Sequence, residues 1–380
     1  MAHRGASHIP SLDGLRGLSV LLVLSSHTMQ TAQLRDVIPG SFGVTVFFFL
    51  SGYLITTLLR VEVEDTGGIA FGKFYLRRAL RIFPPFFLIL LLAALRGHYG
   101  VLIRTGNHME WSYVLGQALQ LTNYLQIYFP TEHLAPGTDI FWSLAVEEHF
   151  YLLFPWIFLW LVRIEEPRKR AAVLLAVCAI VLLWRCYLEF ALQSSYNRTY
   201  CATDTRIDSI LLGCTLAVWG NPVLDPTRIS EKLWKYVLFP LSLAGLAVSF
   251  VVANPSFMDT ARYTLQGVCL VAVFVVAIRY PGWGPMRPLN SRLLSWIGLI
   301  SYSLYLLHLS VLKMVYTVWG HSIWVLLCVG WVASIGLAAA IYYAIERPAG
   351  RLRKRLSAHA VEEPRRTAGN PPMTTPATEA

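Results

Sequence analysis

Two side chains that can carry a charge stand inside the first long apolar stretch of the sequence, Arg16 and His27. On a helix, positions eleven residues apart return to nearly the same face, about 16 Å apart along the axis. Imidazole titrates near neutral pH, so His27 could remove a proton from a hydroxyl group. A guanidinium group binds phosphate through two hydrogen bonds, so Arg16 could hold a phosphate-rich molecule. The structural alternative is that Arg16 snorkels to the lipid headgroups and His27 is a satisfied polar residue at a helix end.

A second group of cations lies within residues 74–87, FYLRRALRIFPPFF, at the start of another apolar stretch. Arg77, Arg78 and Arg81 form a compact basic patch, with the first and last one helical turn apart. The patch could bind the nucleotide phosphates of an acyl donor, and the Pro84–Pro85 pair is expected to kink the chain beside it. Ordinary anchoring of a membrane helix by positive charge would produce the same pattern.

Two adjacent acids, Glu147 and Glu148, lie inside the aromatic-rich stretch 141–155, FWSLAVEEHFYLLFP. A bare carboxylate is costly in an apolar environment, so both acids are candidates for function. The order of the apolar stretches predicts that they lie at the depth of His27, where a carboxylate could orient the imidazole and stabilise its charged form. A structural salt bridge, or the preference of acids for the first turn of a helix, is the alternative.

Two further polar groups have weaker patterns. Arg185 and Glu189 are four residues apart and are predicted to form a salt bridge within one helix. Ser301, Tyr305 and His308 share one helical face, which could line a cavity or bond neighbouring helices to each other.

The elements that must position these residues are membrane helices. The chain has 380 residues, of which 55% are hydrophobic and only 14% charged, whereas a soluble domain has about a quarter charged residues. The predicted fold class is all-α, a polytopic membrane bundle of about ten transmembrane helices. The predicted spans are 12–30, 42–60, 82–96, 142–162, 171–191, 207–220, 235–254, 262–279, 293–317 and 322–345. The stretch 111–128 contains side-chain amides that are costly in lipid, so it is predicted to be interfacial or re-entrant.

The net charge of +10 is concentrated in the short loops of one side. This asymmetry predicts that both termini are cytoplasmic. The chain divides into a membrane domain, 1–350, and a basic, then disordered tail, 351–380. No zinc-finger spacing and no basic helix outside the loops and tail is present, so a nucleic-acid partner is not predicted. The six cysteines form no Cys-x-x-Cys pair, so no metal or redox site is predicted.

Together these motifs resemble the acyltransferase-3 family of bacterial membrane acyltransferases. The matching segments are 12–27, 42–56, 77–81, 142–155, 300–309 and 346–348. The resemblance implies ten helices in the bacterial cytoplasmic membrane. It also implies transfer of an acetyl or other short acyl group from acyl-CoA, with acetyl-CoA the expected donor. The implied acceptor is a sugar hydroxyl on a cell-surface glycan or a glycosylated small molecule.

Carried over residue by residue, the resemblance implies that His27 is the catalytic histidine and Arg16 its partner. It maps the basic motif, which would bind the donor, onto the arginine cluster and the acidic motif onto the paired glutamates. These residues are Arg77, Arg78, Arg81, Glu147 and Glu148. The sequence contains no match to the extracytoplasmic domain appended in some relatives, so the membrane residues are expected to perform the transfer alone.

Other classes of protein also place ionisable side chains in membrane helices. A transporter or channel would use Arg, Glu and His residues as an ion or substrate path, although the sequence has no inverted repeat or paired broken helices. A membrane cytochrome would need axial ligands, for which His27 and His308 are candidates. An inactive scaffold of the same fold is the third alternative. Acyl-CoA hydrolysis that depends on His27 would separate the enzyme from the transporter.

Overall fold

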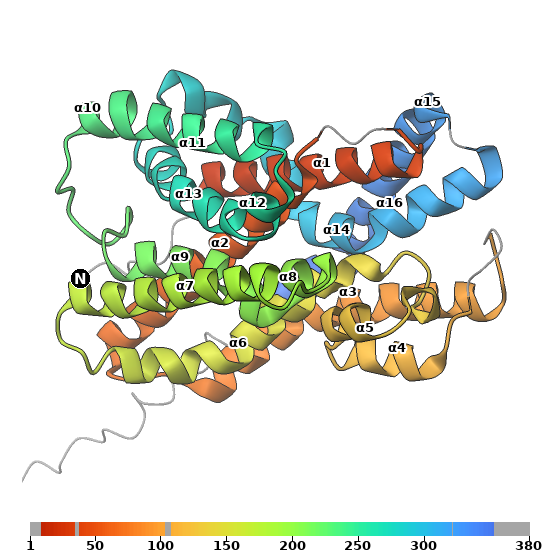
Figure 1. Cartoon of the computed structure of the whole chain (residues 1–380), viewed down its shortest axis with the longest axis horizontal. Helices are drawn as coiled ribbons and strands as arrows, with labels where there is room; N and C mark the ends of the chain where they lie inside the picture. The colour runs from red at the N-terminus through yellow and green to blue at the C-terminus, as the bar shows by residue number, and fades with distance from the viewer. Residues whose placement is uncertain (1–8, 35–37, 103–107, 321, 353–380) are drawn as a thin grey trace, which may run out of the picture.

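The computed structural model describes residues 9–34, 38–102, 108–320 and 322–352, and within them the secondary structure is entirely helical (Figure 1). The first elements are α1 (Pro10–Thr31), α2 (Gly40–Thr66), α3 (Phe71–His98), α4 (Trp111–Ala118), α5 (Thr122–Tyr128), η1 (Thr131–His133), η2 (Asp139–Phe141), α6 (Trp142–Leu161), α7 (Pro167–Phe190), α8 (Tyr196–Cys201) and α9 (Thr203–Val218). They are followed by α10 (Glu231–Leu233), η3 (Trp234–Leu238), α11 (Phe239–Val251), α12 (Pro255–Asp259), α13 (Ala261–Arg279), η4 (Gly284–Asn290), α14 (Arg292–Trp319), α15 (Ile323–Val325), η5 (Leu326–Gly330), α16 (Trp331–Ile341) and η6 (Tyr342–Glu346). Of the predicted tail, 351–380, only residues 351 and 352 are described, and they continue the last helical stretch. Residues 353–380 lie outside the described part of the chain.

Eight helical stretches of the described chain are long and apolar enough to cross a membrane. They are Gly40–Thr66, Phe71–His98, Asp139–Leu161, Pro167–Phe190, Glu231–Val251, Ala261–Arg279, Arg292–Trp319 and Ile323–Leu352. Each overlaps a predicted span, so the prediction of a polytopic all-α membrane protein is confirmed for these eight. Apolar side chains on their outer faces are exposed, as expected for surfaces that contact lipid.

The other two predicted spans, 12–30 and 207–220, form α1 and α9. Neither of these two helices is both long and apolar enough to cross a membrane on its own. Helix α9 has 16 residues, a length of about 24 Å, and α1 carries several charged or polar side chains. Both helices are enclosed by their neighbours: 12 of the 16 residues of α9 are buried, and α9 lies between α2 and α7 (Figure 1). An enclosed helix needs neither a continuous apolar surface nor a full bilayer length, because protein replaces lipid around it.

The segment between α3 and α6 folds back into the protein. The predicted interfacial stretch 111–128 forms the two short helices α4 and α5, and its amide side chains are used inside the fold. Gln117 donates to Thr138 Oγ1 at 2.7 Å and accepts from the amide of Ala135 at 3.2 Å. Helix α3 is longer than predicted and continues through Pro84–Pro85 as one helix.

Helices α1 and α14 touch at the level of their backbones. A Cβ atom at Gly17 of α1 would overlap the carbonyl oxygen of Leu294 in α14, and one at Gly298 of α14 would overlap that of Asp13 in α1. Only glycine permits this approach, because any side chain would push the helices apart. The contact brings the far halves of both helices, which carry His27 and His308, within hydrogen-bonding distance.

A buried ion pair joins α7 to α9 and corrects the predicted pairing within α7. Arg185 donates two hydrogen bonds to Asp208, at 2.8 Å and 3.1 Å, and both side chains are fully buried. Glu189 instead accepts from Ser256. The reason is geometric: the Asp208 carboxylate on the neighbouring helix accepts from both terminal guanidinium nitrogens at once, while Glu189 is engaged by Ser256 of α12.

We expect Arg185→Met to lower the free energy of unfolding by about 3–5 kcal/mol, because it leaves the Asp208 carboxylate buried without its counter-charge. Thermal unfolding of the purified protein in detergent measures the effect. The matched control is Arg198→Gln, whose partner Asp204 is 42% exposed, so its loss should cost less than about 1 kcal/mol. Equal shifts in the two variants would contradict the assignment of Arg185–Asp208 as a major structural contact.

Candidate active site

Two adjoining cavities of the described structure hold most of the sequence-predicted site residues, while Arg77 and Glu148 line neither. The first, which we name the arginine cavity, has a volume of about 100 Å³ and is lined by Arg16, Arg78, Arg81 and Glu147 among others. The second, the histidine cavity, has a volume of about 900 Å³ and is lined by His27. The cationic and the imidazole groups predicted from sequence therefore occupy adjoining spaces rather than one pocket.

The two cavities have Val44 of α2 and Tyr305 of α14 in common as lining residues. The hydroxyl group of Tyr305 lies 2.6 Å from Ser143 Oγ and donates to the carbonyl oxygen of Ile140 at 3.0 Å. These bonds fix the ring of Tyr305 between α14 and the beginning of α6. Val44 and Tyr305 thus form part of the wall through which the cavities adjoin.

The imidazole of His27 is oriented by a second histidine, His308 of α14. Nδ1 of His27 lies 2.9 Å from Nε2 of His308, and Nδ1 of His308 lies 2.7 Å from the carbonyl oxygen of Tyr305. A carbonyl oxygen can only accept, so in the neutral pair Nδ1 of His308 carries its hydrogen and its Nε2 accepts from His27. This assignment leaves the basic lone pair of His27 on Nε2, the nitrogen that a general base needs.

The same distance excludes the cytochrome interpretation for this pair. Two metal–nitrogen bonds of about 2 Å on opposite sides of one ion would separate the ring nitrogens by about 4 Å. The observed 2.9 Å between His27 and His308 is the length of a hydrogen bond. His308 is also fully buried and bonded on both nitrogens.

The arginines do not all face the same space. Arg16 lines the arginine cavity and forms an ion pair of 2.9 Å with Asp13, one turn earlier on α1. Arg78 and Arg81 line the same cavity from α3. Arg77 does not, because it bonds Glu62 of α2 at 3.1 Å. Of the three arginines predicted as one patch, Arg78 and Arg81 therefore line the cavity, while Arg77 is held outside it although it lies one helical turn from Arg81.

Glu147 lies in the arginine cavity, away from the position predicted for it. Its carboxylate accepts from Ser51 at 3.1 Å and from Tyr151 at 2.9 Å, so the expected contact with His27 is not present. The adjacent Glu148 keeps one carboxylate oxygen, Oε1, buried and without a hydrogen bond among the described residues. Neither acid orients the imidazole in this structure.

The register of α6 explains this difference. Asp139, just before α6, lines the histidine cavity together with His27 and bonds Lys313 at 3.1 Å. Glu147 is eight residues further on, about 12 Å deeper at 1.5 Å per residue. The carboxylate at the level of His27 is therefore Asp139, which the sequence analysis missed because nothing showed how far the connection before α6 enters the bundle.

Other contributors to the site were also missed. The role of His308 could have been found from its position on the polar face with Ser301 and Tyr305, but its partner could not. Ser51 and Tyr151, which hold Glu147, lie on different helices and carry no sequence signal of their own.

The fold and the two cavities define a multi-pass membrane protein with a cationic pocket beside a pocket that holds a candidate base. The sequence pattern of a family described as an acyltransferase domain matches residues 9–343. The chain therefore belongs to the acyltransferase-3 family, as its motifs predict. No solved structure matches the chain at a significant level.

Several curated proteins of Staphylococcus aureus are similar to the chain. A protein of strain COL that is named as a candidate O-acetyltransferase is 30% identical over 325 residues, which are 82% of this chain and 52% of the relative. The O-acetyltransferase OatA of strain NCTC 8325 / PS 47 is 31% identical over 330 residues, 81% of this chain and 51% of the relative. The chain thus spans about half the length of the curated relatives it matches.

Proposed function

We propose that this protein transfers an acetyl or other short acyl group from acyl-CoA to a hydroxyl group of a sugar-containing acceptor, with His27 as the general base. The acceptor is a cell-surface glycan or a glycosylated small molecule. The observation that carries the proposal is the His27–His308 pair, because it leaves a basic nitrogen on an imidazole that lines a large cavity. The names of the relatives support acetyl as the group transferred.

The donor would bind from the side of the arginine cavity. Arg78 and Arg81 line it, and Arg81 is exposed, so its guanidinium group stands where a solvent-borne phosphate could reach it. A volume of about 100 Å³ suits the thioester end of the donor rather than its nucleotide. The phosphates would then remain at the mouth, on the side that the basic loops assign to the cytoplasm.

The acceptor would bind in the histidine cavity. Its volume of about 900 Å³ falls in the range of small-molecule sites, and both polar and aromatic side chains line it. Lining residues of both kinds are Gln30, Gln126, Asp139, Trp142, Tyr196, Asn197, Tyr200, Arg262 and Gln266.

The reaction would take place where the cavities adjoin. His27 accepts the proton of the acceptor hydroxyl, whose oxygen attacks the thioester carbonyl and forms the ester bond as the C–S bond breaks. The CoA thiolate takes the proton back from His27 and leaves as the thiol. His308 positions the ring of His27 for this step. Val44 and Tyr305 line both cavities and so stand beside the path of the acyl group.

Acyl transfer can be measured on the purified full chain in proteoliposomes with acetyl-CoA and a panel of glycan acceptors. The proposal requires the release of free CoA thiol together with an acetyl ester on the acceptor. Movement of an unmodified acceptor or ion across the membrane, with no ester formed, would overturn it in favour of a transporter.

We expect Arg78→Gln and Arg81→Gln each to raise the KM for acyl-CoA about tenfold or more, because each removes a charge-assisted hydrogen bond to phosphate. The matched control is Arg77→Gln, which should change the KM less than about threefold since Arg77 is held by Glu62. Steady-state kinetics at saturating acceptor measures the three values. A larger effect at Arg77 than at Arg78 and Arg81 would show that the donor binds elsewhere.

A further inference from the structure

A third cavity, which we name the α7–α13 groove, lies apart from the two described above. It has a volume of about 550 Å³ and is lined by apolar side chains of α7, α9 and α13. Two of them, Leu175 and Val268, are 43% and 53% exposed. Since these helices belong to a membrane protein, exposed apolar side chains in their spans contact lipid, and the groove opens toward acyl chains rather than water.

One end of the groove is strongly cationic. Arg168 in the first turn of α7, Arg228 in the connection between α9 and α10, and Arg279 at the end of α13 all line it. Arg168 and Arg228 are exposed and make no hydrogen bond or ion pair with any described residue. The beginning of α7 lies at the same end of the bundle as the connection to α10 (Figure 1), and its helix dipole adds to the positive potential.

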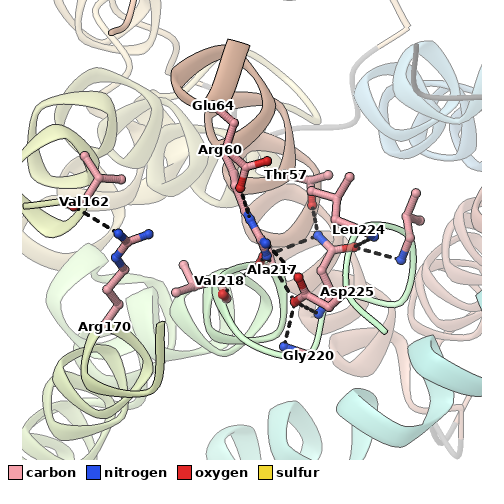
Figure 2. Close-up of polar contacts among 12 residues, drawn as sticks. Thr57, Arg60, Glu64, Val162, Arg170, Ala217, Val218, Gly220, Leu224 and Asp225 are labelled. Atoms are coloured by element: carbon pink, nitrogen blue, oxygen red, sulfur yellow. Dashed lines mark hydrogen bonds and ion pairs between the residues drawn. The ribbon is translucent and has the colours of Figure 1, made fainter. Parts of the chain in front are cut away.

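A single acid, Asp225, lines this end, and its charge is already compensated. Arg60 bonds it through both oxygens, at 2.7 Å and 3.1 Å, and the amides of Gly220 and Asn221 donate to it as well (Figure 2). Burial alone would raise the pKa of Asp225, but the hydrogen bonds from Arg60 and these amides lower it below its ordinary value. Asp225 is therefore an ionised carboxylate already paired with Arg60. It does not cancel the charge of the three arginines that line the groove, which we name the groove arginines (Arg168, Arg228 and Arg279).

The neighbouring arginine Arg170 shows what a purely structural cation looks like here. It does not line the groove and donates to the carbonyl oxygen of Val162, just after α6 (Figure 2), and to that of Ile164. The three groove arginines differ from it. Arg279 uses one nitrogen, Nη2, for backbone carbonyls, while Arg168 and Arg228 are unengaged within the described chain.

From the apolar floor and the cationic end, we infer that the α7–α13 groove binds an anionic phospholipid. The headgroup phosphate lies among Arg168, Arg228 and Arg279, and one acyl chain follows the apolar floor toward Leu175 and Val268. Basic pockets between membrane helices recognise such headgroups through charge and their tails through burial. This site is separate from both active-site cavities and does not depend on the proposed acyl transfer.

Two tryptophans in the groove, Trp219 and Trp234, provide a direct measurement. The purified full chain in detergent is titrated with phosphatidylglycerol that carries brominated acyl chains, which quench nearby indole fluorescence. We expect saturable quenching, most of which is lost in the double variant Trp219→Phe, Trp234→Phe. Quenching that survives unchanged in this double variant would overturn the assignment.

Charge recognition is tested with the double variant Arg168→Gln, Arg228→Gln, which should bind brominated phosphatidylglycerol about 30-fold more weakly, at about fivefold per arginine. The control Arg163→Gln removes an exposed cation of the connection between α6 and α7 that does not line the groove, so the affinity of this variant for the lipid should change less than about twofold. Equal losses of affinity in the two variants would mean that the lipid is attracted by the overall positive charge of the protein. That result would overturn the assignment of a specific site.

Two further binding experiments test whether the arginines bind a lipid headgroup or a soluble phosphate. Phosphatidylcholine with the same brominated chains should bind at least about tenfold more weakly, because its headgroup is not anionic. Millimolar inorganic phosphate or CoA should not displace bound phosphatidylglycerol. Displacement by either would show that the arginines bind a soluble anion and would overturn the lipid assignment.

Discussion

Replacement of His27 by alanine is expected to lower the rate of acyl transfer by about three orders of magnitude. A positioned general base contributes about 10²–10⁴-fold to a reaction of this kind, and His27 is the imidazole whose orientation in the structure leaves a basic nitrogen at the histidine cavity. The KM for acyl-CoA should stay within about threefold, because the donor arginines line the other cavity. Initial rates of ester formation at saturating donor and acceptor measure the effect.

Two controls separate loss of the base from loss of the fold. His108→Ala removes an exposed histidine that lines neither cavity and should leave the rate unchanged. His27→Gln keeps a side chain that can donate to His308 but has no basic nitrogen, so it should be as inactive as alanine while the protein unfolds at the same temperature as the wild type. Activity of His27→Gln above about a tenth of the wild type would remove the base assignment.

The helices themselves could be predicted from the sequence, because apolar length is a property of each segment alone. The spans around Phe71–His98 and Arg292–Trp319 illustrate this, since each is long and apolar enough to cross a bilayer whatever surrounds it. Helices α1 and α9 were predicted as spans of the same kind, although protein rather than lipid surrounds most of their surface. Whether a helix is surrounded by protein depends on how the other helices pack around it, and the sequence of the helix itself does not indicate this.

Residue types that are costly in a membrane could also be predicted as candidates, but their partners could not. His27 and Arg16 stand out because ionisable groups in apolar helices need a compensating contact. That His27 meets His308, and not Glu147, depends on how deep α6 begins after the irregular connection between α3 and α6. A shift of a few residues in that connection would move Glu147 by several ångströms.

The sequence also could not predict whether an arginine pairs with a carboxylate on its own helix or with one on a neighbouring helix. Arg185 has a carboxylate four residues away, yet it pairs with Asp208 on another helix, and Arg77, one helical turn from Arg81, pairs with Glu62 of α2. In both cases a carboxylate on an adjacent helix satisfies the guanidinium group. Helical spacing predicts which residues share a face but not which face meets a neighbour.

His308→Ala should lower the turnover number about 100-fold without changing the KM for acyl-CoA. Without the ring nitrogen that accepts from Nδ1–H, His27 can rotate and can carry its hydrogen on Nε2, so only part of the population has the base in the productive form. The backbone contact between α1 and α14 at Gly17 and Gly298 does not involve either ring, so the helices should remain packed. Parallel measurements of turnover, KM and unfolding temperature check these three expectations.

The conservative variant and a double-mutant cycle distinguish positioning from a structural role. His308→Gln offers an amide oxygen to accept from His27 and an amide group to donate to the carbonyl of Tyr305, so it should recover at least about tenfold over alanine. Because His308 acts through His27, the double variant His27→Ala, His308→Ala should be no slower than His27→Ala alone. If the two losses multiplied instead, His308 would contribute independently of His27, and the shared hydrogen bond of 2.9 Å would not be the route of its effect.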